Sequence, residues 1–336
     1  MIRVWGFKLA HMFPDELIFG VHFAPEGADF EKVRRLCLYA EELGFNIFTI
    51  TDHFLSMTLG FGVAAPPHLI RHPLECWTTL AGLAALTNRI RLGPLVSCYY
   101  FRLPTVLAKM ATTIDIISKG RLVFGLGAGW HKMEFESFIG KFPTMRERLL
   151  GLEETIQICR SMFTKEETSF RGRIYRFEKV VNLPLPIQRP PPLIVGGGGK
   201  GTLRIAARHA DISHFPNIPD ERILDQKLTI LKEYCRSIGR DYNEIVKGIL
   251  LGVATGYTKE EIKAKLWEVA ALRGMSPEEF KKRMALVDGN PDQCIKAIKE
   301  KYIDRGITFF TLLLPTPRDY ELFAKEVMPE LRRAYR

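Results

Sequence analysis

The feature that most constrains this fold is a regular alternation, along 336 residues, of short apolar segments with longer amphipathic ones. The short segments are rich in β-branched and aromatic residues, which is typical of buried parallel strands. The longer segments place apolar residues three or four positions apart, which indicates helices with one buried face. The predicted strands cover residues 17–22, 46–51, 90–96, 121–126, 193–196, 211–214, 247–254 and 307–314.

The intervening segments carry helix signals at their ends. Asp29 stands at the N-cap of a segment that Gly44 ends, and Pro104 stands in the first turn of another, where its missing N–H costs nothing. Eight strand–helix units predict a parallel α/β sheet closed into a (β/α)8 TIM barrel. The alternative, a doubly wound open sheet, usually shows a glycine fingerprint after the first strand, whereas HFAPEGADF follows it here.

We expect residues 1–336 to form one barrel domain with three insertions. They lie at about 55–72, 165–192 and 257–290, where the spacing between predicted elements exceeds an ordinary loop. The third insertion includes KEEIKAKLWEVAALRGMSPEEFKKRM, which has the pattern of a charged helical pair. The first two follow the second and fourth strands and therefore rise from the carboxyl end of the barrel, where the chemistry of such barrels takes place.

Composition and charge exclude several classes of protein. No apolar run is long enough to span a bilayer and the N-terminal segment lacks the apolar core of a signal peptide, so we expect a cytoplasmic protein. The net charge of +10 suits an acidic partner, but no long Lys/Arg block or nucleic-acid motif is present, which argues against nucleic acid. Six cysteines without a CxxC pair, and histidines without metal-binding spacing, predict no metal site.

Polar side chains follow the second and third predicted strands. Asp52 and His53 stand directly after the second strand, at the catalytic rim of a barrel. A histidine beside a carboxylate can donate or accept a proton, so we predict a catalytic role for the pair; the alternative is a local cap. Ser97 and Cys98 end the third strand at the same rim. Cys98 could be a nucleophile, but no motif supports this, and we expect a small side chain that lines a pocket.

Two glycine-rich segments follow later strands. Gly125, Gly127 and Gly129 alternate at the end of the fourth strand, which lets a planar ligand or a phosphate approach the backbone, although the spacing differs from a dinucleotide fingerprint. The four glycines 196–199 join the fifth strand to a helix and precede Lys200. Unshielded amides, a helix N-terminus and a cation predict a phosphate site here; the alternative is a flexible linker.

With these residues in place, the chain resembles the bacterial-luciferase-like flavin and deazaflavin oxidoreductases, a TIM-barrel family. The resemblance extends from about Gly20 to Leu314 and is carried by GFNIFTITDHF, RLPTVLAKMATTIDIISKGRLVFGLGAGW and PPLIVGGGG, in that order. The middle block looks most like the branch that uses the deazaflavin coenzyme F420, a hydride carrier with a phosphodiester-linked polyglutamate tail. This branch implies hydride exchange between F420 and a small organic substrate.

The resemblance also implies roles for matched residues. His53 and Asp52 match the catalytic polar pair, and Glu26 matches an acidic position after the first strand of some deazaflavin-dependent dehydrogenases. At Ser97–Cys98 the family has a non-proline cis peptide that bulges against the cofactor ring. The positions matched to the cofactor site are Asp52, Ser97, Cys98, Gly127, Ala128, Gly129, Glu134, Gly196, Gly197, Gly198 and Gly199.

Two positions depart from the sugar-phosphate and alcohol dehydrogenases of this branch. Met57 replaces a tryptophan and Trp130 replaces a carboxylate, so neither of those substrates is predicted and the acid of their proton relay is not apparent. An FMN-dependent monooxygenase that receives reduced FMN from a partner reductase is the alternative enzyme. A non-catalytic relative that binds a cofactor is the third hypothesis. Family members usually pair through helices near strands two and three, which implies a homodimer.

Overall fold

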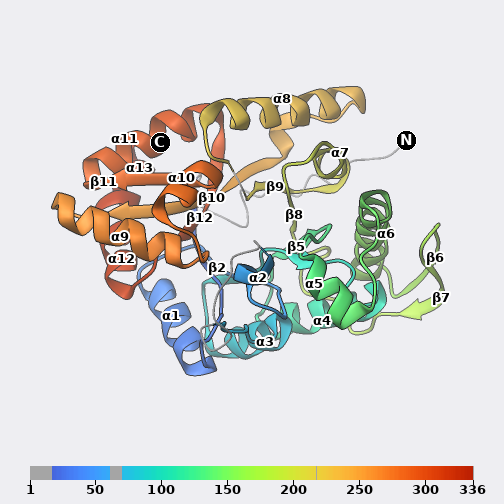
Figure 1. Cartoon of the computed structure of the whole chain (residues 1–336). Coiled ribbons are helices and arrows are strands. Elements are labelled where there is room, and N and C mark those ends of the chain that lie inside the picture. The colour runs from blue at the N-terminus through green and yellow to red at the C-terminus, as the bar shows by residue number, and fades with distance from the viewer. Residues whose placement is uncertain (1–16, 61–69, 217, 336) are drawn as a thin grey trace.

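The computed structural model describes residues 17–60, 70–216 and 218–335, and its central element is a parallel barrel (Figure 1). Each of the eight predicted strands is present, and the third is divided in two. In chain order the barrel strands are β1 (Ile18–Phe23), β2 (Ile47–Ile50), β3 (Arg91–Pro94), β4 (Ser97–Cys98), β5 (Phe124–Gly127), β8 (Leu193–Gly196), β9 (Ile212–Phe215), β10 (Val246–Thr255) and β12 (Ile307–Leu313).

The sheet closes on itself between β3 and the chain that enters β5. The strands pair in the order β3-β2-β1-β12-β10-β9-β8-β5-β4, and all of these pairs are parallel. A parallel bridge between Leu92 and Leu122 then connects β3 to the chain entering β5. The Val123 N–H donates to the Leu92 carbonyl at 2.8 Å. Closure leaves no open edge on this path, so the competing open sheet is excluded.

Helices cover the outside of the barrel. They are α1 (Phe30–Glu42), α3 (Cys76–Leu86), α4 (Pro104–Ile117), α6 (Met145–Thr164), α7 (Lys200–His209), α8 (Glu221–Ser237), α11 (Pro291–Lys301), α12 (Pro317–Leu322) and α13 (Met328–Tyr335). Asp29 caps α1 by accepting from the Lys32 N–H, and Pro104 begins α4, as predicted. Among the described residues, no helix combines the length and apolar character that a bilayer crossing requires.

Two hydrophobic clusters hold the layers together. The interior of the barrel is filled by a small set that includes Ile18, Ile47, Val123, Ile194 and Phe309. A much larger cluster lies between strands and helices. Apolar side chains on both faces of each strand explain why the strands are near-continuous apolar runs in the sequence.

The three predicted insertions contain structure of their own. After β2 come α2 (Met57–Gly60) and a stretch, 61–69, that lies outside the described residues. Between α6 and β8, the antiparallel strands β6 (Glu167–Arg171) and β7 (Arg176–Val181) form a hairpin beside α6 (Figure 1). The third contains α9 (Lys259–Ala271), α10 (Pro277–Arg283) and a strand the sequence analysis missed, β11 (Ala285–Gly289), which pairs with β10. Five residues are too few to show a period, which explains the miss.

Candidate active site

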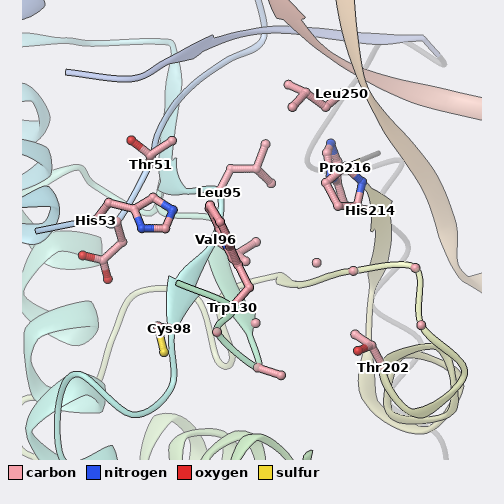
Figure 2. A pocket seen from close by; sticks show the side chains of 18 of the residues that line it. Thr51, His53, Leu95, Val96, Cys98, Trp130, Thr202, His214, Pro216 and Leu250 are labelled. Atoms are coloured by element: carbon pink, nitrogen blue, oxygen red, sulfur yellow. The ribbon is translucent and has the colours of Figure 1, made fainter. Parts of the chain in front are cut away.

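A cavity of about 540 Å³ opens at the carboxyl end of the barrel (Figure 2). Residues at the ends of β2, β5, β8 and β9 contribute to its lining, as barrel geometry predicts. Glu26 and Ser97 are not among the lining side chains of the described residues. The predicted site residues that line the cavity are Asp52, His53, Cys98, Gly127, Ala128, Gly129, Glu134, Gly196, Gly197, Gly198, Gly199 and Lys200.

His53 is held in place by a fully buried glutamate. Its Nδ1 lies 2.8 Å from Oε2 of Glu134, and Oε1 of Glu134 accepts hydrogen bonds from the Phe54 and Leu55 N–H groups at 2.7 and 2.9 Å. Burial alone would raise the pKa of Glu134, but the hydrogen bond and charge of His53 outweigh it and hold that pKa below its ordinary value. The carboxylate therefore accepts the Nδ1 proton, and His53 presents Nε2 to the cavity (Figure 2).

Both carboxylate oxygens of Asp52 are bound in a network behind the cavity wall. Arg102 holds them with Nη1 at 2.7 Å from Oδ2 and Nη2 at 3.0 Å from Oδ1, and the Asp52 side chain is fully buried. The Ser97 hydroxyl also donates to Oδ2, and Trp77 Nε1 donates to Ser97 Oγ at 3.1 Å. Arg102 pairs with Glu75 as well. Asp52 thus fixes the turn that carries His53, and hydrogen-bond donors contact both of its oxygens.

The non-proline cis peptide lies two residues before its predicted position. It joins Leu95 to Val96, between β3 and β4. Ser97 and Cys98 form β4, which pairs in regular parallel register with β5, so the interruption of the strand falls before them. The prediction for Ser97–Cys98 is therefore wrong. Cys98 is buried, and burial raises the pKa of its thiol to about 12, which leaves no thiolate to act as a nucleophile at neutral pH.

One wall of the cavity consists of Val96 and bare glycine backbone. A Cβ on Gly127 would lie 2.6 Å from Val96 Cγ2, and one on Gly196 would lie 2.7 Å from Val96 Cγ1. Gly127 and Gly196 therefore make room for Val96 as well as exposing backbone, a packing role the sequence analysis missed. A Cβ on Gly125 would instead clash with the Pro94 carbonyl oxygen. The result is a low wall of Val96 and backbone on which a planar ring fits.

The loop after β5 forms the next part of the lining. Gly129 has φ +74°, and a Cβ there would lie 2.6 Å from the Phe135 ring and 2.7 Å from Cys98 Sγ, so glycine is required. Ala128 and Trp130 follow the same turn. The Trp130 ring stands edge-on to His53, with centroids 5.5 Å apart. This loop thus packs a bulky aromatic group against the imidazole.

The glycine loop after β8 leads into the N-terminus of α7. Gly199 is the N-cap of α7, no side chain caps the helix, and a Cβ on Gly199 would meet open space. Lys227, which the sequence analysis missed, donates from Nζ to the Gly198 carbonyl at 2.8 Å and adds positive charge beneath the loop. Lys200 begins the helix and lines the cavity. Free amides, the helix dipole and two lysines form an anion cradle at this end of the cavity.

A second wall is formed by side chains that carry no sequence motif. His22 on β1 and His214 on β9 line the cavity with Leu250 (Figure 2 shows the last two). His22 Nδ1 lies 2.9 Å from Thr49 Oγ1, and His214 Nε2 lies 2.8 Å from Thr311 Oγ1. Burial lowers the pKa of His214 to about 3 and that of His22 well below its ordinary value. Both rings are neutral at physiological pH. In the sequence, the signal that could have identified these two histidines as site residues is their position near the ends of strands.

Glu26 supports the segment that follows β2. Its Oε2 accepts from the Ser56 hydroxyl at 2.6 Å and its Oε1 accepts from the Met57 N–H at 2.9 Å. Met57 lines the cavity, so Glu26 reaches the site through this neighbour. The predicted catalytic role of Glu26 therefore remains a prediction, and its contacts favour positioning of the segment above the cavity.

Comparison with known proteins identifies the family. The model of the luciferase-like monooxygenase family matches residues 18–308, which is most of the chain and includes every barrel strand before β12 and the start of β12. The chain belongs to this family. Among curated proteins, an F420-dependent glucose-6-phosphate dehydrogenase of Rhodococcus jostii is 27% identical over 323 residues, which cover 88% of this chain and 92% of the relative.

Solved structures of an F420-dependent reductase and of a monooxygenase share the fold. An F420-dependent tetrahydromethanopterin reductase from Methanopyrus kandleri aligns with a TM-score of 0.77 at 20% identity, covering 94% of this chain and 99% of that one. A monooxygenase from Streptomyces bottropensis aligns with a TM-score of 0.76 at 22% identity and the same coverage. At these identities the likeness establishes the barrel and does not choose between the two chemistries.

Proposed function

We propose that the chain is an oxidoreductase that exchanges hydride between coenzyme F420 and a small organic substrate. The single observation that carries this proposal is the His53–Glu134 pair, facing a cavity with an uncapped helix N-terminus at one end. The curated relatives with F420-dependent activity support the choice of cofactor. The deazaflavin, when bound, supplies the carbon that carries the hydride.

The residues present fit this cofactor. The wall of Val96 and glycine backbone accepts a planar ring, because the glycines carry no side chain that would occupy the space. The amides at the start of α7, with Lys200 and Lys227, accept a phosphodiester. Lys200 is exposed, so a longer acidic tail can continue past it toward solvent.

His53 accepts or donates the proton that accompanies hydride exchange, depending on the direction of the reaction. With Nδ1 bound to the Glu134 carboxylate, Nε2 accepts a proton when a substrate hydroxyl is oxidised and returns it when a carbonyl is reduced. Glu134 stabilises the imidazolium between these steps by its charge, as an orienting carboxylate does in other proton-transfer sites. Asp52, bound to Arg102, keeps the turn rigid and is proposed as a positioning residue.

A titration tests the cofactor and separates it from FMN. We expect F420 to bind with micromolar or tighter affinity and reduced FMN to bind negligibly; the reverse result would identify the monooxygenase alternative. Gly199→Asp tests the phosphate position, because the new carboxylate would cap α7 and occupy the anion cradle in open space. It should weaken F420 binding at least tenfold, whereas Gly199→Ala, the matched neutral control, should leave it within a few-fold.

We also propose that the protein is a homodimer. Leu103 and Val106 at the start of α4, and Ile116 and Ile117 at its end, are exposed in the single chain. Exposed apolar side chains along a helix that follows the third barrel strand are suited to an interface between copies. Sedimentation equilibrium at micromolar concentration should give twice the chain mass, and a monomer would refute the proposal.

A further inference from the structure

Arg273 is a buried cation that lines the active-site cavity. It follows α9 in the third insertion, and its residue is 7% exposed. Burial lowers the pKa of its guanidinium to about 10, so it remains charged at neutral pH. Fully buried arginines are rare in proteins unless a carboxylate or another anion pairs with them.

The described residues provide no such anion. No carboxylate among them forms an ion pair with Arg273. Its Nη1 donates to Met57 Sδ at 3.0 Å, and a thioether sulfur is a weak acceptor. The buried Nε has no hydrogen-bond partner among the described residues. Glu26 is the acidic group whose charge reaches Arg273, but its two oxygens accept hydrogen bonds from Ser56 and Met57.

The groups around Arg273 leave its charge unbalanced on the cavity side. His22 lies near enough to feel the charge of Arg273, which adds to burial in lowering its pKa. Both His22 and His214 have a ring nitrogen against a threonine hydroxyl. Since the two rings are neutral, Arg273 is the charged group that these three described side chains present to the cavity.

We propose that Arg273 binds a carboxylate of the substrate, so that the enzyme acts on small organic acids. The guanidinium fork matches the planar carboxylate with paired N–H donors, one of which is the unpartnered Nε. The anion cradle of α7 lies at the glycine loop after β8, so the cavity has two separate anion positions, one for the cofactor phosphodiester and one for the substrate. This inference rests on the proposed function, because it assigns the glycine-lined side of the cavity to the cofactor ring.

Binding of a small aromatic acid and its neutral isostere tests the proposal. We would titrate benzoate and benzamide into the F420-loaded protein and into the protein without cofactor, by calorimetry. Wild type should bind benzoate at least tenfold more tightly than benzamide. Arg273→Met should remove this preference and leave benzamide binding within a few-fold, and Arg273→Lys should retain part of it. Arg236→Met, on the exposed face of α8, is the matched control and should behave as wild type.

Equal binding of the two probes to wild type, or an unchanged preference in Arg273→Met, would overturn the proposal. If Arg273→Met instead weakens F420 binding while benzoate and benzamide bind alike, the anion belongs to the cofactor and the substrate assignment is wrong. If F420 fails to bind wild type but the benzoate preference depends on Arg273, the carboxylate site stands and the proposed function fails. Thermal unfolding of Arg273→Met should show no loss of stability, because the substitution removes a buried unpaired charge.

Discussion

Replacement of Glu134 by glutamine should reverse the tautomer of His53. Oε1 of Glu134 accepts two backbone N–H groups, from Phe54 and Leu55, so the amide oxygen of a glutamine must take that place. Its NH₂ group then faces Nδ1 of His53, 2.8 Å away in the wild type. Two donors cannot share one hydrogen bond, so Nδ1 must become the acceptor and the proton must move to Nε2.

The size of this change follows from the charge that is removed. A hydrogen bond to an ionised carboxylate contributes about 1.5–3 kcal/mol, which favours the Nδ1–H tautomer by a factor of about 10 to 150. The neutral amide contributes about 0.5–1.5 kcal/mol in favour of the opposite tautomer. The population should therefore change from almost entirely Nδ1–H to mostly Nε2–H. The Nε2 atom that faces the cavity then loses its ability to accept a proton.

The assay is heteronuclear NMR of isotope-labelled histidine rings at a pH of about 9, where an ordinary imidazole is neutral. His53→Gln identifies the signal of His53 by its loss. Glu154→Gln is the matched control, because Glu154 is also a buried carboxylate that holds a loop, through the N–H groups of Arg173 and Tyr175, without a histidine partner. If His53 keeps the same tautomer in Glu134→Gln, the hydrogen-bond argument for Glu134 is refuted.

Three further predictions concern stability. The pKa of His214 is about 3 in the fold and about 6.5 in the unfolded chain, so between these pH values only the unfolded chain binds the proton. Through His214, lowering the pH from 7.5 to 5 should therefore lower the free energy of unfolding by about 2 kcal/mol, as measured by urea denaturation. Arg102→Met leaves the buried carboxylate of Asp52 without its cation and should lower the free energy of unfolding by about 3–5 kcal/mol. Gly196→Ala should cost about 1–3 kcal/mol through its clash with Val96, whereas Gly199→Ala should be tolerated.

Each of these predictions has a control on the same protein. His214→Gln should remove the share of the pH dependence between 6.5 and 5 that comes from His214 and leave the share that comes from His22, whose pKa burial also lowers. This range lies above that in which carboxylates titrate, and an unchanged slope would contradict the assignment to His214. Arg34→Met removes an exposed pair with Glu31 and should leave the free energy of unfolding almost unchanged, because solvent screens the pair. Equal losses for Arg34→Met and Arg102→Met would show that the Asp52 pair is not buried in solution.

The barrel could be predicted from the sequence because its strands are buried on both faces. Runs such as Ile307–Leu313 are apolar except for Thr308 and Thr311, so length and bounding turns were enough to place them. The break between β3 and β4 could not be predicted, since Leu95 and Val96 continue the same apolar run. The hairpin of β6 and β7 lies in the predicted insertion at 165–192, but its strands could not be predicted, because they are mostly exposed and hold few apolar residues.

Apart from positions matched through the family resemblance, such as Glu134, the site residues that could be predicted are those that directly follow a strand. His53 and the glycines after β8 directly follow strands, so barrel geometry alone brings them to one cavity. The contact of His53 with Glu134 spans 81 residues, and that of Arg273 with Met57 spans 216. No local pattern encodes such pairs, because they depend on how loops from distant parts of the chain pack together over the barrel.

A basic side chain indicates a particular kind of ligand only where it is buried beside a cavity. Most lysines and arginines lie at the surface, where solvent screens their charge and pairing with glutamates such as Glu31 contributes little. Arg273 differs because the charge is removed from water beside two neutral imidazoles, so its field acts on whatever occupies the cavity. A net charge of +10 could equally suit nucleic acid, whereas one buried guanidinium facing a cavity of about 540 Å³ selects for a small anion.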